Sequence, residues 1–147
     1  MQSQKIDVTF LVGCIVKICP IAEIDIYNIH PASIGNHGGN GMYGLAVHKH
    51  VLQEVIDLIS RGRKTLSDKF YTYPTIHEVE VEYDAGAPLM VGAVEIPTKF
   101  IEQLLSSEIN LYEAAEMLQK IVLPYEWKML PCAVQMAVQR IFDKMED

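Results

Sequence analysis

The residues from Asp7 to Ile18, DVTFLVGCIVKI, form an almost continuous apolar run that is rich in β-branched side chains. Such a run is typical of a strand that is covered on both faces in a mainly parallel sheet, so we predict a central strand here. After Pro20, the residues Ile24 to Ile29 predict a second strand, which Pro31 ends because proline cannot donate to a strand ladder. His30 then lies at the carboxyl end of a strand, the edge where open α/β sheets bind ligands.

A glycine-rich segment separates these strands from a helical pattern. Four glycines between Gly35 and Gly41 favour a loop and permit close approach of the backbone to a ligand, so we expect no regular structure there. From Leu45 onward apolar residues recur at helical spacing, and Gly62 suits the position just after a helix end. Period-two alternation predicts a half-exposed strand from Ile76 to Val81, and the apolar run from Leu89 to Ile96 predicts another.

The last third of the chain has a helical pattern. Asn110 and Glu113 have the spacing of a capping box, which predicts a helix over Leu111 to Leu123. Pro124 is expected to start a separate final helix. Strands that alternate with helices predict an α/β fold with a mostly parallel sheet and flanking helices.

Length and charge exclude several classes of function. With 147 residues, half of them hydrophobic, the chain can bury one substantial core, and we expect a single domain over residues 1–147. No apolar stretch is long enough to span a membrane, and the opening residues MQSQKID lack a signal-peptide pattern, so we expect a cytoplasmic protein. A net charge of −7 argues against nucleic acid as a partner, because phosphate binding requires clustered Lys and Arg.

Three polar residues form a candidate catalytic group. Asn28 and His30 are two apart on a predicted strand, so both side chains project from one face. An amide donor beside an imidazole can stabilise the oxyanion that forms when an amine attacks an acyl carbon. Asp84, in a turn followed by Gly86, can supply the carboxylate that such chemistry needs. By pattern alone, Asn-x-His before proline is more often a strand-terminating turn than an active site.

The histidines do not predict a metal site. His48 and His50 are two apart in a predicted helix and point in different directions. The others, His30, His37 and His77, share no recognised ligand spacing. We therefore expect no bound metal.

Several motifs together resemble the folate-dependent formyltransferase family, of the phosphoribosylglycinamide formyltransferase type. The segment Tyr27 to Pro31, YNIHP, resembles its Asn-Ile-His-Pro signature. Four further segments resemble the family in the same order along the chain, namely the strand from Asp7 to Ile18, Gly38 to Gly44 with Val47-His48, Thr75 to His77 with Tyr83 to Gly86, and Tyr125 to Trp127. Five elements in sequence order outweigh the interpretation of a simple turn.

The resemblance implies a truncated Rossmann-like formyltransferase fold that passes a formyl group from 10-formyltetrahydrofolate to a primary amine, similar to glycinamide ribonucleotide. It implies that Asn28 binds the formyl oxygen, His30 stabilises the oxyanion, and Asp84 relays the proton lost by the amine. It further implies that substrate binding involves Glu126 and His77, the latter in a supporting role. The implied folate-pocket residues are Val16, Lys17, Ile18, Glu82, Tyr83 and Ala85.

Family members begin with a strand and a substrate-phosphate loop, and nothing similar precedes Lys5 in this sequence. Without that half the Asp7 strand is an exposed apolar edge, which proteins normally cover. We therefore expect a homodimer or a partner subunit at this edge. An alternative interpretation is a catalytically silent subunit that binds folate or a partner chain.

Overall fold

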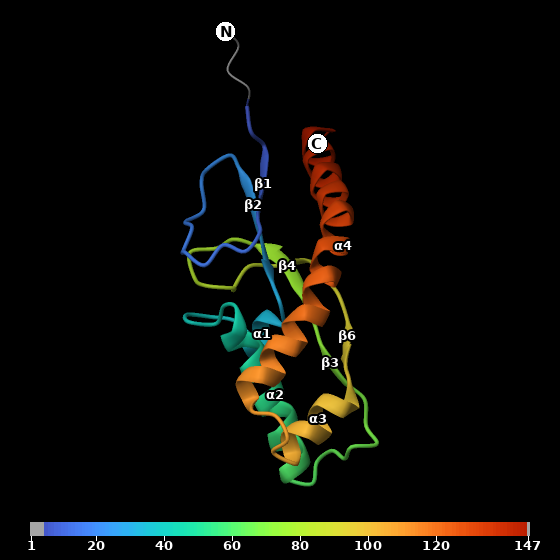
Figure 1. The fold of residues 1–147 in the computed structure, drawn as a ribbon. Helices are drawn as coiled ribbons and strands as arrows, with labels where there is room; N and C mark the ends of the chain where they lie inside the picture. The colour runs from blue at the N-terminus through green and yellow to red at the C-terminus, as the bar shows by residue number, and fades with distance from the viewer. Residues whose placement is uncertain (1–4, 147) are drawn as a thin grey trace.

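The computed structural model describes residues 5–146 (Figure 1). Residues 1–4, with most of the segment that lacks a signal-peptide pattern, lie outside the described residues. The elements in chain order are β1 (Val8–Leu11), β2 (Asp25–His30), α1 (Ile34–His37), α2 (Leu45–Ser60), β3 (Phe70–Thr72), β4 (Thr75–Glu78), β5 (Pro88–Val91), β6 (Val94–Ile96), α3 (Thr98–Leu105) and α4 (Leu111–Glu146).

The main sheet is mixed, which corrects the prediction of a mostly parallel one. Its strand order is β1-β2-β4-β5. Only β1 and β2 are parallel, whereas β4 is antiparallel to both β2 and β5. The prediction rested on the apolar run from Asp7 to Ile18 and on the alternation of strands with helices, neither of which fixes the direction of a strand. The half-exposed strand predicted over Ile76 to Val81 is instead β4, Thr75–Glu78, whose Thr75, Ile76 and His77 are all buried. The α/β class itself is confirmed.

The predicted central strand is a short edge strand. β1 ends at Leu11 and pairs with β2 alone among the described elements. Beyond it Gly13 has a φ of +66°. This left-handed backbone conformation, which glycine adopts readily, is not extended and therefore cannot continue the strand. The apolar residues that follow lie in an exposed loop, with Val16 at 66% exposure. Apolar composition was therefore a poor guide to burial here.

The single strand predicted over Leu89 to Ile96 is two strands in two sheets. β5 completes the main sheet, while β6 pairs with β3 in a separate antiparallel pair. The change of sheet occurs at Gly92, whose N–H donates to the Pro74 carbonyl. A Cβ at this glycine would lie 2.8 Å from the Met129 sulfur, so a larger residue here would require the Met129 side chain to move.

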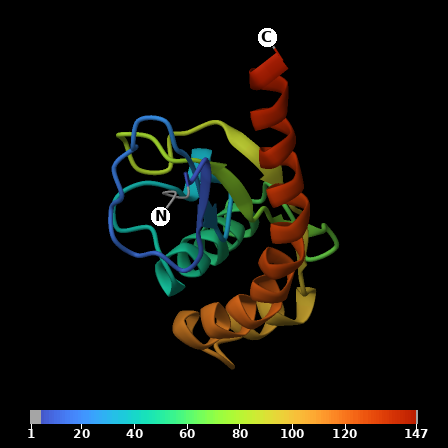
Figure 2. The same cartoon turned by 90° about the horizontal axis from the view of Figure 1, so that it is seen from above.

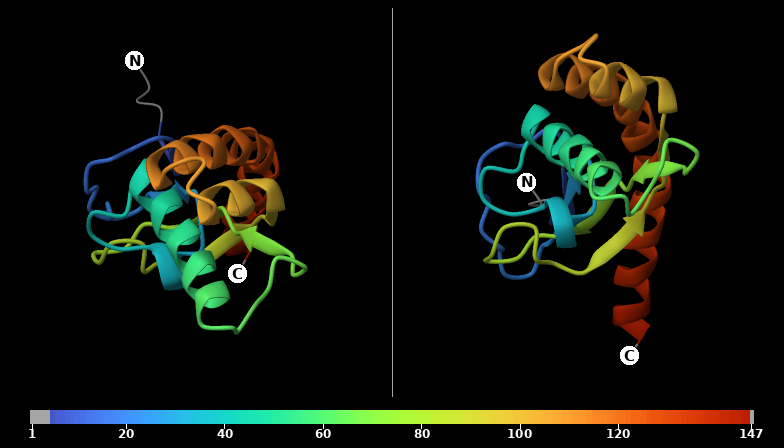
Figure 3. Two further views of the ribbon diagram at one scale, coloured as in Figure 1. Left: turned by 60° about the horizontal axis from the view of Figure 1, so that its bottom comes forward. Right: turned by 90° about the horizontal axis from the view of Figure 1, so that it is seen from below.

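Two helices also differ from expectation. α1 contains Gly35, Asn36 and His37, so the glycine-rich segment is not entirely a loop. α4 runs without interruption through Pro124 and Pro131, although a new helix was expected at Pro124. Both prolines are solvent exposed, and bending can relieve the lost hydrogen bonds at such positions. Figures 2 and 3 show α4 curving around the molecule.

The remaining helix predictions are confirmed. α2 begins at Leu45 and ends at Ser60, with Gly62 in the left-handed region at φ +66°. The capping box at the start of α4 forms in both directions, because Glu113 N–H donates to Asn110 Oδ1 at 3.0 Å and Asn110 N–H donates to Glu113 Oε2 at 2.8 Å.

Two apolar clusters hold the fold together. One joins α2, α3, the first half of α4 and the β3–β6 pair, through residues such as Leu52, Ile101 and Leu118. The other packs the main sheet against the second half of α4, where Ala133 and Ala137 allow close contact with Tyr27 and Ile76. Within residues 5–146, no helix is long and apolar enough to cross a membrane.

Candidate active site

The pairing of β2 with β4 brings the candidate residues together. Asn28 and His30 occupy one face of β2, as their spacing predicts. In the antiparallel register Asn28 lies opposite His77, and directly opposed side chains share a face. Ile29 and Ile76, also opposed, project to the other side. One pair of strands thus presents polar residues to the site and apolar residues to the core.

Asp84 lies between the two histidines. Its Oδ2 is 3.7 Å from His30 Nδ1 and its Oδ1 is 3.3 Å from His77 Nε2. Oδ2 also accepts a hydrogen bond of 2.9 Å from the backbone N–H of Gly39. The structure therefore places Asn28, His30, His77 and Asp84 in one cluster, although sequence reasoning alone did not connect Asp84 with the strand.

Two glycines allow the Asp84 loop to reach this position. Asp84 itself has a φ of +50°, a conformation that Asp tolerates better than most residues. A Cβ at Gly38 would lie 2.8 Å from the Asp84 Cβ. A Cβ at Gly86 would overlap the backbone carbonyl of Glu78. The carboxylate is thus fixed by close backbone packing on both sides.

The outer nitrogen of each histidine is committed to a backbone carbonyl. His30 Nε2 is 2.8 Å from the His37 carbonyl oxygen, and His77 Nδ1 is 2.8 Å from the Glu78 carbonyl oxygen. A carbonyl only accepts, so both of these nitrogens carry the proton. The inner nitrogens, which face Asp84, are then unprotonated when the rings are neutral. The cluster therefore has room for an added proton between either ring and the carboxylate.

Burial and neighbouring charges leave both His30 and Asp84 unprotonated at neutral pH. Burial lowers the pKa of His30 below 6.5, and the opposing effect of Asp84 is smaller. For Asp84, burial raises the pKa, but the contact with His77, the Gly39 N–H and the charge of His30 together bring it below 3.8. At neutral pH His30 is therefore neutral and Asp84 is a carboxylate.

The cluster opens into a cavity of about 500 Å³. Its walls come from β2, from α4 and from the loops at residues 12–18, 39–44 and 79–84. Figures 1 and 2 show the three loops, in blue, teal and yellow-green, gathered on one side of the sheet. Ten of the predicted site residues line this cavity, namely Val16, Lys17, Ile18, Asn28, His30, His77, Glu82, Tyr83, Asp84 and Glu126. The remaining one, Ala85, is exposed and is not part of the lining.

One wall belongs to α4. Gln119, Leu123, Glu126 and Trp127 line the cavity at spacings of three to four residues, which place them on one helix face. Burial raises the pKa of Glu126 from 4.5 to about 7. This carboxyl therefore exchanges its proton near neutral pH beside the reactive cluster.

Sequence reasoning missed several residues of the site. Gln119 and Leu123 are detectable in principle, because they continue the helical stripe of Glu126. His48, 2% exposed and also in the lining, was considered as a metal ligand and as part of a family-like segment, but was not predicted to be a site residue. The His37 carbonyl that holds His30 leaves no signal in the sequence, since any residue offers a carbonyl.

The cluster contains polar atoms without partners. Within the described residues, Asn28 Oδ1, His48 Nδ1 and His77 Nε2 are sealed from solvent and form no hydrogen bond. All three residues line the cavity. Unpartnered buried polar atoms cost free energy and are often found at functional sites. Across residues 5–146, no group of three or more His, Cys, Asp or Glu side chains is arranged to hold a metal ion.

Two plant proteins are similar in sequence to this chain. The chain is 34% identical over 122 residues to a protein of Arabidopsis thaliana named phosphoribosylglycinamide formyltransferase, chloroplastic, an alignment that covers 76% of this chain and 37% of that protein. A protein of Vigna unguiculata with the same name is 31% identical over 122 residues, covering 76% and 35%. The chain is related to the phosphoribosylglycinamide formyltransferases.

This relationship confirms the resemblance found in the motifs. The chain spans little more than a third of the length of these formyltransferases. No family model matches the chain, and no solved structure does.

Proposed function

We propose that this chain carries the formyl-transfer centre of a phosphoribosylglycinamide formyltransferase-type enzyme, which moves a formyl group from 10-formyltetrahydrofolate to a primary amine. The observation that carries the proposal is the convergence of Asn28, His30 and Asp84 on one cavity. An amide, an imidazole and a carboxylate are the groups that acyl transfer to an amine requires. The formyltransferase relatives supply the family context.

The residues present fit a formyl donor. Asn28 Oδ1 and His77 Nε2 are buried atoms without partners, and an N–H of the bound amine would satisfy such acceptors. The NH₂ group of Asn28 is the donor that suits a formyl oxygen. We assign the Asn28 amide to the formyl oxygen. When bound, 10-formyltetrahydrofolate supplies an activated formyl carbon.

The proton released by the amine passes into the His30–Asp84 pair. Attack of the amine nitrogen on the formyl carbon leaves a proton on nitrogen and negative charge on the formyl oxygen. Asp84, held as a carboxylate, accepts or relays this proton, and His30 Nδ1 is the nearest unprotonated site on that ring. A proton there makes His30 a cation beside the developing oxyanion, which it stabilises. When the tetrahedral adduct collapses, the bond from the formyl carbon to the folate nitrogen would break, and that nitrogen would take up the proton held by the His30–Asp84 pair as tetrahydrofolate leaves.

The outer parts of the cavity accommodate the two substrates. We assign Glu126 to the amine, because its carboxyl lines the cavity opposite the sheet and gains a partner when an ammonium or amine binds. His77 faces Asp84 at 3.3 Å and takes a supporting role in the site. The folate walls are assigned to Val16, Lys17 and Ile18 on one side and to Glu82 and Tyr83 on the other; the Lys17 ammonium lies 5.0 Å from the Tyr83 ring centre, so the two loops meet.

An activity assay tests the proposal. The purified chain is incubated with 10-formyltetrahydrofolate and candidate primary amines, glycinamide ribonucleotide among them, and release of tetrahydrofolate is followed by absorbance. Turnover that falls by roughly 10²- to 10⁴-fold in Asp84→Asn supports the assignment. Asp143→Asn, which makes the same change at an exposed carboxylate of α4 outside the cavity lining, is the matched control. Equal inactivity of the chain and of Asp84→Asn, with folate still bound, would favour a catalytically silent subunit.

The edge strand indicates how the chain associates. The outer edge of β1 is unpaired within the described residues, and the loop beyond it exposes Val12, Ile15 and Val16. Exposed apolar strand edges are normally covered. We infer a homodimer or a partner subunit at this edge, which analytical ultracentrifugation of the purified chain tests. A cytoplasmic location stays a prediction.

A further inference from the structure

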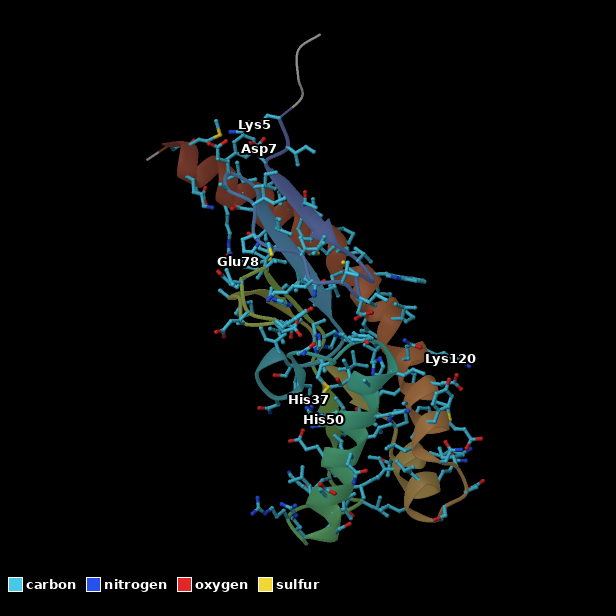
Figure 4. The ribbon with its side chains drawn as sticks, turned by 90° about the vertical axis from the view of Figure 1, so that its left-hand side faces the viewer. Lys5, Asp7, His37, His50, Glu78 and Lys120 are labelled. Atoms are coloured by element: carbon cyan, nitrogen blue, oxygen red, sulfur yellow. The ribbon has the colours of Figure 1, made fainter. Side chains whose placement is uncertain are left out.

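The side chain of His37 joins α1 to α2 through a network outside the cavity. His37 Nδ1 is 2.8 Å from His50 Nδ1, and His37 Nε2 is 2.9 Å from Glu54 Oε2. The two rings meet edge to face, with centroids 5.0 Å apart. Figure 4 shows His37 and His50 side by side. His37 is buried at 7% exposure, whereas His50 and Glu54 lie on the exposed face of α2.

The positions of the protons in this network follow from its acceptors. Glu54 is a carboxylate acceptor, so His37 Nε2 donates to it. His37 Nδ1 is then free to accept, and His50 Nδ1–H donates to it. With both rings neutral, the His37–His50 contact and the His37–Glu54 contact each have one donor and one acceptor. The network is thus complete without any added charge.

The backbone of His37 holds the catalytic histidine. Its carbonyl accepts the hydrogen bond from His30 Nε2 at 2.8 Å. α1 is only four residues long and has no side-chain cap. A helix this short has little stability of its own, so the anchors of the His37 side chain add to the bond from Gly38 N–H to the Ile34 carbonyl in fixing the His37 carbonyl.

We propose that the network of His37, His50 and Glu54 is a positioning device, which fixes the His37 carbonyl and thereby keeps the proton of neutral His30 on Nε2 and the lone pair on Nδ1, facing Asp84. The kinetic consequence rests on the proposed formyl transfer. The effect on the ring of His30 does not. His37 acts through His30 and is a positioning residue.

The network also makes this positioning sensitive to acid. The titratable groups that face His37 are Glu54 and His50 on α2 and His30 on β2. Burial lowers the pKa of His37, Glu54 opposes this, and His50 and His30 add to it. When His37 is protonated, its Nδ1 carries a hydrogen and no longer accepts a hydrogen bond from His50 Nδ1–H. The His37 side chain then loses one of its two anchors.

Two pairs of variants separate positioning from simple structure. His50→Ala and Glu54→Ala each remove one anchor of His37. His50→Asn and Glu54→Gln restore a side chain that can donate or accept at the same place. Gln53→Ala is the matched control, because it removes the surface hydrogen bond of 2.9 Å to Asp57 from the same face of α2 without contacting His37.

The first measurement is the ¹⁵N NMR spectrum of the histidine rings, with His30→Gln used to assign the His30 signals. We expect His30 to be the Nε2–H tautomer in the parent chain and in Gln53→Ala. It should become a mixture of tautomers in both alanine variants and return in His50→Asn and Glu54→Gln. An unchanged His30 tautomer in both alanine variants overturns the proposal, whether or not the chain has activity.

The second measurement is steady-state kinetics. Loss of one neutral hydrogen bond predicts that kcat falls by roughly three- to tenfold with KM for the amine unchanged. A change in KM without a fall in kcat, or an equal fall in kcat in Gln53→Ala, contradicts a role through His30. Absence of turnover in the parent chain refutes the proposed function, and the NMR result still decides the positioning role.

Discussion

Replacing Glu126 with glutamine is expected to make the protein more stable at alkaline pH. Burial raises the pKa of this carboxyl from 4.5 to about 7. Between these values the native state holds a proton that the unfolded state has released, so stability falls as pH rises through this window. The contribution is present in full below pH 4.5 and is lost above pH 7. A glutamine side chain has no such proton to lose, so the Glu126→Gln variant should escape this decline.

The size of the effect follows from the same shift. The difference between 4.5 and about 7 corresponds to roughly 3 kcal/mol if the whole shift persists. Glu126 is only partly buried, and solvent screening reduces this figure. We therefore compare the free energies of unfolding of Glu126→Gln and of the parent chain. The difference in favour of the variant should grow by about 1 to 3 kcal/mol when the pH is raised from 5 to 8.5.

Urea denaturation of both proteins at the two pH values measures this difference. Glu82→Gln serves as the control for removing a carboxylate from the cavity rim. If the advantage of Glu126→Gln is the same at pH 5 and pH 8.5, desolvation of Glu126 is not the cause and the reasoning fails. The KM for the amine adds a second readout, because an ionised Glu126 should bind the amine better above pH 7 and the variant should lose that dependence.

Further predictions concern the histidines and the backbone. Burial lowers the pKa of His48 to about 4, so the free energy of unfolding should fall as pH drops from 6.5 to 4, and urea titrations of His48→Gln should show a weaker fall. His30 also has a lowered pKa, so the acid limb of kcat should lie below pH 6.5; a limb above 6.5 would contradict its burial. Gly86→Ala should lower the midpoint of thermal unfolding and displace the Asp84 loop, since its Cβ overlaps the Glu78 carbonyl; an unchanged midpoint would show that the backbone yields. Asn110→Ala should cost about 1 kcal/mol in urea titrations through loss of the α4 cap, whereas no change would mean that the cap is unimportant.

The parts of the fold that depend on local chemistry were predictable. The spacing of Asn110 and Glu113 gave the start of α4, and Gly62 gave the end of α2. β2 was found because Pro31 closes an apolar run. The direction of β4 was not predictable, because strand pairing is set by contacts distant in sequence.

The site was predictable only in part for the same reason. The face shared by Asn28 and His30 follows from a spacing of two. Their proximity to Asp84 depends on the register of β2 with β4 and on the packing of Gly38 and Gly86, none of which has a local pattern. The resemblance to formyltransferases made that connection from the sequence. The protonation of His30 by contrast depends on a backbone carbonyl, which no motif records.

The register between β2 and β4 also limits how this protein can change. Side chains alternate along a strand, so a slip of β4 by one residue against β2 exchanges the two faces of β4. Ile76 would then face the cavity, while His77 would be forced into the apolar layer beneath α4. Residues 31–74, which connect the two strands, can therefore vary in length more freely than either strand. A single residue inserted within β2 or β4 should abolish both folding and catalysis, because both depend on the same strand register.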